Sequence, residues 1–323
     1  MSTHKFINPG LKINNDTGFG NNANTVGGRF INRDGSFNMQ KEGVPFWTKF
    51  SIYHTMLNMP RWKFISVIIL FYFSINLVYT LIYLLTGASE QLQGLIATTP
   101  WAKFKEVYFF STETFTTVGY GRVNPVGDLA NIIAAIEAMS GFLSFAIATG
   151  LIYGRFSKPR AYLAFSDYAV VAPYQDKTAL MFRFVSYKEN HTLTNVEVVL
   201  TIGLQQLEND KPVFKFYSLA LERSRADNLP MNFTVVHPID ENSPLVGFAF
   251  EDMKTADVEL YVLVKAFDDV YSNVVLQRTS YVYEEILFNR KFVPMYRESD
   301  DGNRTILELH KLSESVEVEI PAR

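Results

Sequence analysis

The sequence predicts a membrane protein: two spanning helices, a shorter helix and an extended loop between them, and an immunoglobulin-like β-sandwich after them. Three observations support this fold class: two long apolar runs, a 43-residue segment between them, and short alternating runs after Pro159. Apolar residues make up 48% of the 323-residue chain and aromatic residues 15%, which is too rich for a disordered protein. The net charge of −3 gives no general attraction to nucleic acid.

The first apolar run, Phe64–Leu85, has 22 residues and no charge. At about 1.5 Å per residue it covers the roughly 30 Å hydrocarbon core of a bilayer, so we predict a transmembrane helix at about residues 61–86. Arg61, Trp62 and Lys63 close one end, as aromatic and basic residues do at membrane interfaces. A buried helix of a large soluble core is the alternative.

The second apolar run, Leu129–Tyr153, is also long enough to cross, and we predict a helix at about residues 129–156. Its only charge is Glu137, and an ionisable group at membrane depth faces protein or water. Small residues recur along the run and suit close packing between helices.

Basic residues indicate the orientation of the two spans. Three lie between the spans: Lys103, Lys105 and Arg122. Seven lie on the outer flanks: Lys41, Lys49, Arg61, Lys63, Arg155, Lys158 and Arg160. This asymmetry predicts that both termini are cytoplasmic, with residues 1–43 as an N-terminal cytoplasmic segment. The chain has no cysteine, which excludes disulfides and thiolate metal sites.

An interfacial helix is predicted in residues 44–59, over Val44–Leu57. Its apolar positions fall on one face: Phe46, Phe50, Tyr53 and Leu57. Such a face suits a helix that lies on the membrane surface. Pro60 then separates this helix from the spanning helix.

Residues 158–316 alternate apolar and polar residues in short runs, which predicts about seven strands and a β-sandwich. The predicted strands are 180–187, 196–204, 213–221, 232–239, 258–267, 273–283 and 304–312. Residues 317–323 are left as a C-terminal tail. His237, near the end of the run 232–239, is expected to order a loop between strands.

The segment between the spans is too short for a domain. Trp101–Thr117 has helical character but is too short to cross, and an extended stretch follows it. Such backbone is tolerated at membrane depth only where it is buried in protein or lines water, which is what a pore needs. Gly119 and Gly121 allow backbone angles closed to other residues, so the loop can direct its carbonyls at an axis.

The stretch TTVGYG, Thr116–Gly121, contains TVGYG, the known selectivity-filter sequence of potassium channels, and so resembles that filter. Five further segments resemble the prokaryotic branch of the inward-rectifier potassium channels: GRFINRDGSFN (28–38), PRWK (60–63), GRFSKPR (154–160), VVHPIDENSPL (235–245) and RTSYVYEEILFNRKFVPM (278–295). The likeness covers about residues 18–316. Eukaryotic members carry a disulfide in their outer loops, so the lack of cysteine fits a bacterial member.

The resemblance implies a homotetramer in the inner (plasma) membrane of the cell, because one subunit cannot enclose an axis. Potassium passes down its gradient without an enzymatic step, and no cofactor is expected beyond the permeant ion. The pore domain is 60–157, with the pore helix and filter at about 101–121. Potassium is expected to bind the backbone carbonyls of the filter and the Thr117 hydroxyl; the filter residues are Thr116, Thr117, Val118, Gly119, Tyr120 and Gly121.

Glu113 and Arg122 bracket the filter. The resemblance implies that an acid in the pore helix pairs with the basic residue and braces the filter from behind. Many members carry the arginine one place later, and two separately solvated charges are the alternative.

Two constrictions are expected along the pore. At 100° per residue, Phe145, Thr149 and Tyr153 form one stripe of the second span, where the resemblance places the cavity and the bundle crossing; a packing stripe is the alternative. Glu137 lies about 80° off this stripe and is expected to pack behind the filter. The second constriction is a cytoplasmic loop gate: Phe267, Asp268, Asp269, Ser272 and Asn273.

Rectification is expected to be weak. Strongly rectifying members carry an acid on the inner helix that holds polyamine or Mg²⁺, and the matching position here is Phe145, which offers no charge. Any residual block is expected from Asp268 or Asp269.

A basic cluster at the cytoplasmic interface is expected to bind anionic lipid, at about 1 kcal/mol per charge. Its members are Arg61, Lys63, Arg155, Lys158 and Arg160. Charges that only set the topology are the alternative.

Two other functions are alternatives to a potassium channel. A membrane-anchored β-sandwich sensor or binding protein with a non-conducting filter is disfavoured by the intact TTVGYG stretch. A channel gated by a nucleotide-binding domain would need a Rossmann pattern after residue 160, and the sequence has none.

Overall fold

The structure is a computed structural model, and it describes residues 29–45, 51–189, 191–208 and 211–319. The chain divides into two compact units. The membrane unit is Glu42–Lys158, and the β unit combines Met1–Lys41 with Pro159–Arg323. Each unit is described by itself.

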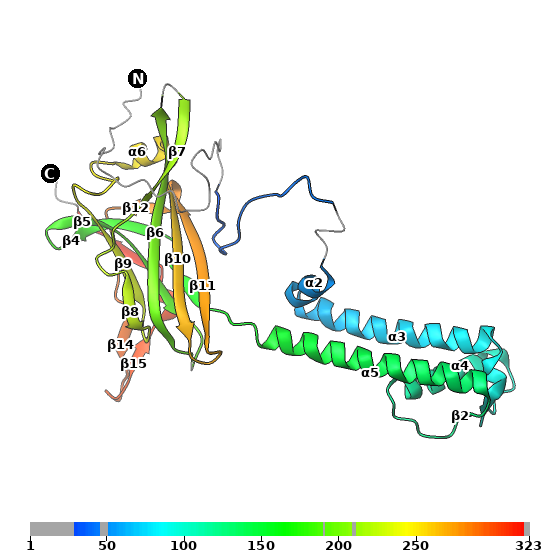
Figure 1. The fold of residues 1–323 in the computed structure, drawn as a ribbon. Helices are drawn as coiled ribbons and strands as arrows, with labels where there is room; N and C mark the ends of the chain where they lie inside the picture. Colours follow the sequence, from blue (N-terminus) through cyan, green and yellow to red (C-terminus); the bar gives the residue numbers. More distant parts are fainter. Residues whose placement is uncertain (1–28, 46–50, 190, 209–210, 320–323) are drawn as a thin grey trace. The chain divides into compact units, whose positions relative to one another are not determined.

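The membrane unit contains two helices that are long and apolar enough to cross a bilayer, α3 (Arg61–Leu85) and α5 (Asp128–Phe156). At 25 and 29 residues they measure about 37 and 43 Å, more than the roughly 30 Å needed. Figure 1 shows them running side by side, with α4 (Pro100–Phe115) packed at one end. The 16 residues of α4 span about 24 Å, so α4 stops short of crossing.

Local sequence signals set the ends of these helices. Pro60 precedes α3, and α4 begins with Pro100 behind Thr99, whose hydroxyl accepts a hydrogen bond from the Ala102 N–H at 3.2 Å. Gly87 follows α3 at a φ of 75°, which favours glycine as a helix terminator. A small buried core then joins α3, α4 and α5 through Tyr83, Val107, Phe110, Ala130 and Ile133.

Shorter elements complete the membrane unit. These are α2 (Ile52–Asn58), η1 (Ala88–Gln91), β1 (Leu92–Gln93) and β2 (Asn124–Pro125). Within the predicted interfacial helix, Phe46 and Phe50 lie outside the described residues, and Val44 and Pro45 are not helical. The described helix carries Tyr53 and Leu57 and ends at Asn58.

The β unit is a sandwich of two five-stranded sheets. One sheet has the order β11–β10–β6–β7 with β8 also paired to β6: Asn273–Val282, Glu259–Asp268, Leu193–Glu208, Lys211–Ser218 and Arg225–Asn228. The other has the order β12–β4–β5–β3 with β9 also paired to β5: Ile286–Phe288, Ala169–Tyr174, Lys177–Ser186, Leu163–Phe165 and Phe233–Ile239. All pairings in the two sheets are antiparallel except β12 with β4.

One continuous core lies between the two sheets. The rings of Phe182 on β5 and Tyr281 on β11 pack at a tilt, with centroids 5.6 Å apart, and Leu200 and Leu260 belong to the same core. The remaining elements of the described β unit are α6 (Phe250–Thr255), η2 (Tyr283–Glu285), η3 (Leu309–Lys311) and two antiparallel strand pairs, β13–β16 (Arg290–Phe292, Ser315–Glu317) and β14–β15 (Tyr296–Glu298, Thr305–Leu307).

The structure changes the last predicted strand. Residues 304–312 form a three-residue strand and a 3₁₀ turn, because the stretch pairs only with the short strand β14 and then turns back. The prediction for His237 is confirmed: the buried ring lies 2.6 Å from the Ala220 carbonyl through Nδ1 and 2.7 Å from Ser243 Oγ through Nε2. Burial lowers the pKa of His237, so the ring is neutral and joins two loops.

Candidate ion-conduction site

The filter segment begins where α4 ends. The N–H groups of Val118 and Gly119 both donate to the Glu113 carbonyl, at 3.0 and 3.3 Å, so the last turn of α4 holds the start of the loop. Positive φ angles of 58°, 53° and 82° at Thr117, Gly119 and Gly121 alternate with negative ones at Val118 and Tyr120. Alternation of left- and right-handed angles turns successive peptide groups the same way, which suits a row of ion-binding carbonyls.

The filter segment is uncovered within a single chain. All residues from Thr116 to Gly121 are exposed, with Val118 at 56% and Tyr120 at 81%. Lipid offers no hydrogen bonds to backbone at membrane depth, so this segment requires protein or water around it.

The predicted pairing of Glu113 with Arg122 is not formed in this chain. Arg122 Nη1 lies 3.6 Å from Glu106 Oε1 and 3.3 Å from the Gly94 carbonyl, and the described Glu113 side chain has no ion pair with it. The chain turns back after Phe115, and the loop brings Arg122 beside Glu106, two helical turns before Glu113 on α4. Glu106 Oε2 also accepts from the Ile96 N–H at 3.0 Å.

Behind the filter, Glu137 is confirmed as a packed residue. Its carboxylate is fully buried and accepts hydrogen bonds from Tyr83 of α3 and Ser111 of α4. The stripe expected on the inner helix lies on another, open side of α5. Phe145 and Tyr153 are 74% and 71% exposed, and Thr149 between them is exposed.

The basic cluster divides into two kinds of residue. Arg155 donates to the backbone carbonyls of Met56 and Met59, at 2.7 and 2.9 Å, and its guanidinium lies 4.5 Å from the Phe64 ring centroid. It therefore holds the end of α2. Lys158 Nζ donates to Asn58 Oδ1 at 2.6 Å, and three further cations are exposed: Arg61, Lys63 and Arg160.

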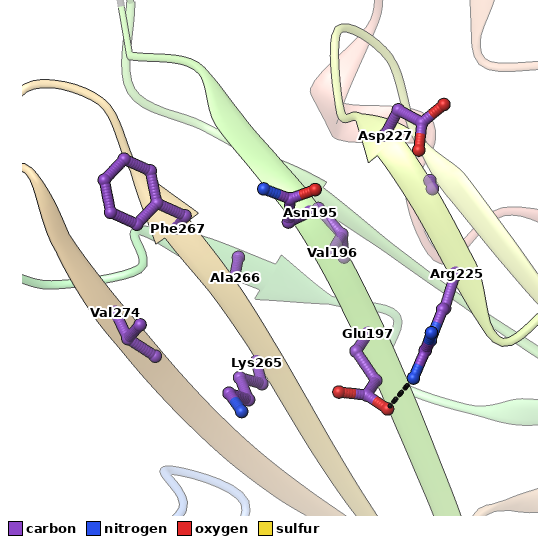
Figure 2. Close-up of a pocket in the computed structure, with 10 residues that line it drawn as sticks. Asn195, Val196, Glu197, Arg225, Asp227, Lys265, Ala266, Phe267 and Val274 are labelled. Carbon is purple, nitrogen blue, oxygen red and sulfur yellow. Dashed lines mark hydrogen bonds and ion pairs between the residues drawn. The ribbon is translucent and has the colours of Figure 1, made fainter.

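The predicted loop gate is the turn between β10 and β11. Figure 2 shows Phe267 beside a cavity of about 400 Å³ that Lys265 of β10, Val274 of β11 and Glu197 of β6 also line. Ser272 in the turn has a φ of 48°, and the Asn273 side chain accepts from the Val274 N–H at 2.8 Å.

Asp268 is a correction to the sequence-based expectation. Its carboxylate is fully buried, accepts from the Val270 and Tyr271 N–H groups at 2.9 and 3.2 Å, and lies 2.9 Å from His191 Nε2. These contacts order the turn, so Asp268 cannot meet a blocker in water. Asp269 is exposed and accepts from Thr194 Oγ1 at 3.2 Å.

Comparisons with known proteins agree with this geometry. A family model described as "Inward rectifier potassium channel C-terminal domain" matches residues 163–323, and one described as "Ion channel" matches residues 67–158. The inward rectifier potassium channel Kirbac3.1 of Paramagnetospirillum magnetotacticum is 32% identical over 289 residues, which cover 88% of this chain and 95% of that protein. This chain belongs to the prokaryotic branch of the inward rectifier potassium channel family.

Vertebrate channels of the family are more distant. "ATP-sensitive inward rectifier potassium channel 12" of Gallus gallus is 24% identical over 88% of this chain and 72% of its own length. "Inward rectifier potassium channel 4" of Mesocricetus auratus is 27% identical over 60% of this chain and 46% of its own length.

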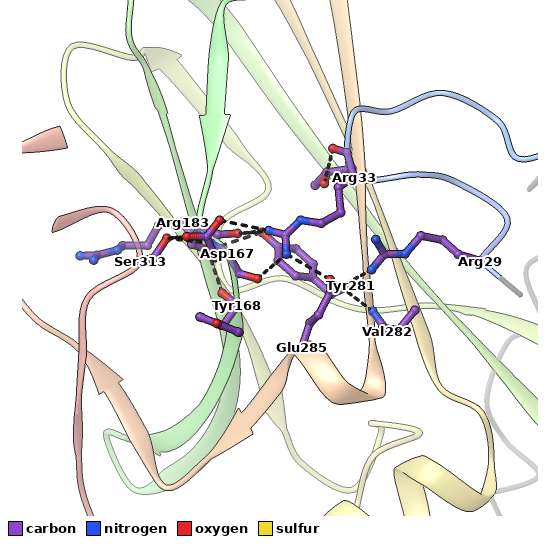
Figure 3. Close-up of polar contacts among 11 residues, drawn as sticks. Arg29, Arg33, Asp167, Tyr168, Arg183, Tyr281, Val282, Glu285 and Ser313 are labelled. Atoms are coloured by element: carbon purple, nitrogen blue, oxygen red, sulfur yellow. Dashed lines mark hydrogen bonds and ion pairs between the residues drawn. The ribbon is translucent and has the colours of Figure 1, made fainter. Parts of the chain in front are cut away.

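The channel also contains a polar contact that the sequence did not reveal. Figure 3 shows Arg29 and Arg33, from the segment before the membrane unit, converging on Glu285. Arg33 also donates to the Asp167 carbonyl at 2.6 Å, so the segment contacts both η2 and the loop between β3 and β4. The only signal was the motif GRFINRDGSFN itself, which does not specify its partners.

Proposed function

We propose that four copies of this chain form a potassium-selective channel whose filter is residues 116–121 of each copy. The observation that carries this proposal is the exposed loop with alternating backbone angles at the end of a helix too short to cross. Carbonyl oxygens of Thr117 to Tyr120, with the Thr117 hydroxyl, replace the water around a potassium ion. Thr116 caps the pore helix by donating to the Thr112 carbonyl at 2.7 Å.

The uncovered surface supports a tetramer. Filter backbone and the Phe145–Tyr153 stripe of α5 are both open in one chain, and a closed ring of copies directs both toward a shared axis and away from lipid. Fourfold symmetry rests on the family. In this assembly Tyr153 forms the inner-helix constriction, and the turn at Phe267 forms a cytoplasmic one.

We assign lipid binding to the exposed cations of the basic cluster, Arg61, Lys63, Lys158 and Arg160. The role of Arg155 is to fix α2 beside α5 through its hydrogen bonds to the Met56 and Met59 carbonyls. Both termini are cytoplasmic and the channel lies in the inner membrane, in agreement with the distribution of basic residues. With Phe145 neutral and Asp268 buried, block by polyamine or Mg²⁺ is shallow.

Rubidium uptake into liposomes containing the purified full-length channel tests this function. We expect uptake that external potassium competes with and sodium does not, together with a tetramer by mass measurement in detergent. A tetramer without flux would favour the sensor with a non-conducting filter, and equal competition by sodium would contradict the assignment of the filter.

A further inference from the structure

A buried polar cluster joins the three helices of the membrane unit behind the filter. Glu137 on α5 accepts a hydrogen bond from Tyr83 Oη on α3 at 3.0 Å through Oε2, and one from Ser111 Oγ on α4 through Oε1. Ser111 Oγ also lies 3.2 Å from both the backbone oxygen and Oδ1 of Asn76 on α3. These four side chains are fully buried.

A second contact between α5 and α4 lies one helical turn further along both helices. A Cβ built on Gly141 would lie 1.8 Å from the Phe115 carbonyl oxygen, so the two backbones meet there. Glu137 and Gly141 are four residues apart on α5, and Ser111 and Phe115 are four residues apart on α4. Residues at this spacing share a helix face, so α5 grips the last turn of α4 at two successive points.

That last turn is the part of α4 on which the filter depends. The Glu113 carbonyl lies between the two gripped residues in sequence and accepts from the N–H groups of Val118 and Gly119. A rotation or slide of α4 therefore moves the first carbonyls of the filter directly.

We propose that Glu137 is a positioning residue for ion selectivity: by holding Ser111 against Tyr83 it sets the depth and rotation of the pore helix, and through that helix the spacing of the filter carbonyls. This inference rests on the proposed function. A site needs its groups held within about 0.5 Å by supporting contacts, and Glu137 supplies such a contact without touching the ion.

The number of hydrogen-bond donors and acceptors in this cluster predicts which substitutions at Glu137 preserve its hydrogen bonds. Ser111 has one hydroxyl proton and three acceptor atoms around it. Glutamine at position 137 can accept from Tyr83 and donate to Ser111, which frees the serine proton for Asn76. Leucine at the same position leaves the buried Tyr83 hydroxyl without its acceptor and removes the hydrogen bond that joins Ser111 to α5.

The test compares Glu137→Leu, Glu137→Gln and a matched control, Tyr79→Phe, in the full-length channel in planar bilayers. Tyr79 Oη lies 3.0 Å from Ser140 Oγ, so the control removes a hydrogen bond between α3 and α5 that does not involve α4. The readout is the ratio of sodium to potassium permeability in tetramers that conduct. We expect Glu137→Leu to raise this ratio about tenfold, the effect of one lost buried hydrogen bond, and the other two variants to keep the unmodified ratio.

A conducting Glu137→Leu tetramer with the unmodified ratio overturns the inference, as does an equal change in Tyr79→Phe. Where Glu137→Leu does not assemble, the double variant Ser111→Ala with Tyr83→Phe is measured instead, with the same two outcomes. Failure of the proposed function is distinct, because in that case the unmodified protein itself conducts no potassium.

Discussion

Backbone angle, not space, explains why position 119 is glycine. Gly119 has a φ of 53°, while a Cβ built on it meets no atom within 4 Å. An alanine there costs about 1–2 kcal/mol in each subunit because the left-handed region is unfavourable for residues with a Cβ. We therefore expect Gly119→Ala to lose potassium selectivity or flux in liposomes.

Gly150 provides the matched control for this substitution. It also has open space around its Cβ position, but it lies inside α5, where alanine improves helix propensity by up to about 1 kcal/mol. Gly150→Ala should keep the unmodified ratio of potassium to sodium flux. An unaltered ratio in Gly119→Ala would show that the positive φ is not needed for selectivity.

Glu259 gives the β unit a pH dependence. Burial raises the pKa of its carboxyl to about 7, although the Phe30 N–H at 3.2 Å, Tyr261 Oη at 3.0 Å and the nearby Arg29 favour the charged form. The folded protein then binds the proton more tightly than the unfolded chain, whose pKa is near 4.5. Stability is therefore greatest at low pH and falls as pH rises from about 5 through 7, by up to about 3 kcal/mol.

Glu259→Gln should remove this component of the pH dependence. The measurement is the melting temperature of the full-length channel in detergent at pH 5.5 and pH 8, with the exposed neighbour variant Glu284→Gln as control. We expect a smaller drop with pH in Glu259→Gln than in the control. The same drop in both variants would assign the pH dependence to other groups.

At the level of elements, Arg155 makes two charged hydrogen bonds to the backbone at the end of α2, and Lys158 makes one to the Asn58 side chain. Arg155 donates to two carbonyls at the C-terminal end of this seven-residue helix, which is too short to be stable alone. Arg155→Gln should speed hydrogen exchange of the amides of Ile52–Asn58 about tenfold, because the charged hydrogen bonds are lost. Lys63→Gln should leave this exchange unchanged and weaken only the response of flux to anionic lipid. Unchanged exchange in Arg155→Gln would return Arg155 to the lipid-binding group.

The open stripe of α5 carries the proposed inner gate. Four Tyr153 rings converging on the axis exclude water and make ion passage costly, so Tyr153→Ala should raise basal potassium flux several-fold. Thr149→Ala, one turn away on the same stripe, serves as the control because its hydroxyl is already bonded to the Phe145 carbonyl at 2.9 Å. Basal flux that does not change in a tetrameric Tyr153→Ala channel would move the gate to the turn at Phe267.

Helices and strands with a long, regular pattern of apolar residues were predictable from the sequence. Short strands whose position depends on the strand they pair with were not. The spans and the long strands β5, β6, β10 and β11 were predicted because their apolar pattern repeats over many residues. The short strands β3, β4 and β8 were missed, since three to six residues carry too little pattern and their pairing is set by β5 and β6.

The same limit applies to the candidate site. The filter was predicted from its sequence motif, TTVGYG, and the stripe on α5 was predicted from helical spacing. The choice of Glu106 over Glu113 as the partner of Arg122, and the burial of Asp268, depend on where two distant segments meet in space. The spacing of residues in the sequence carries no information about tertiary contacts between distant segments.

For the whole molecule, a single chain leaves open the surfaces that a ring of copies would enclose. Backbone that would otherwise face lipid, an open aromatic stripe on α5 and a gripped pore helix all fit a closed ring around an ion path. The buried cores of both units, in contrast, are complete within one chain.

The reversal potential of the purified channel between potassium on one side of a planar bilayer and sodium on the other tests the central claim most directly. A filter of aligned carbonyls predicts a reversal potential displaced by about 59 mV for each factor of ten in selectivity for potassium over sodium, in the direction that potassium alone would give. A reversal potential near zero, from tetramers that carry current, would contradict it.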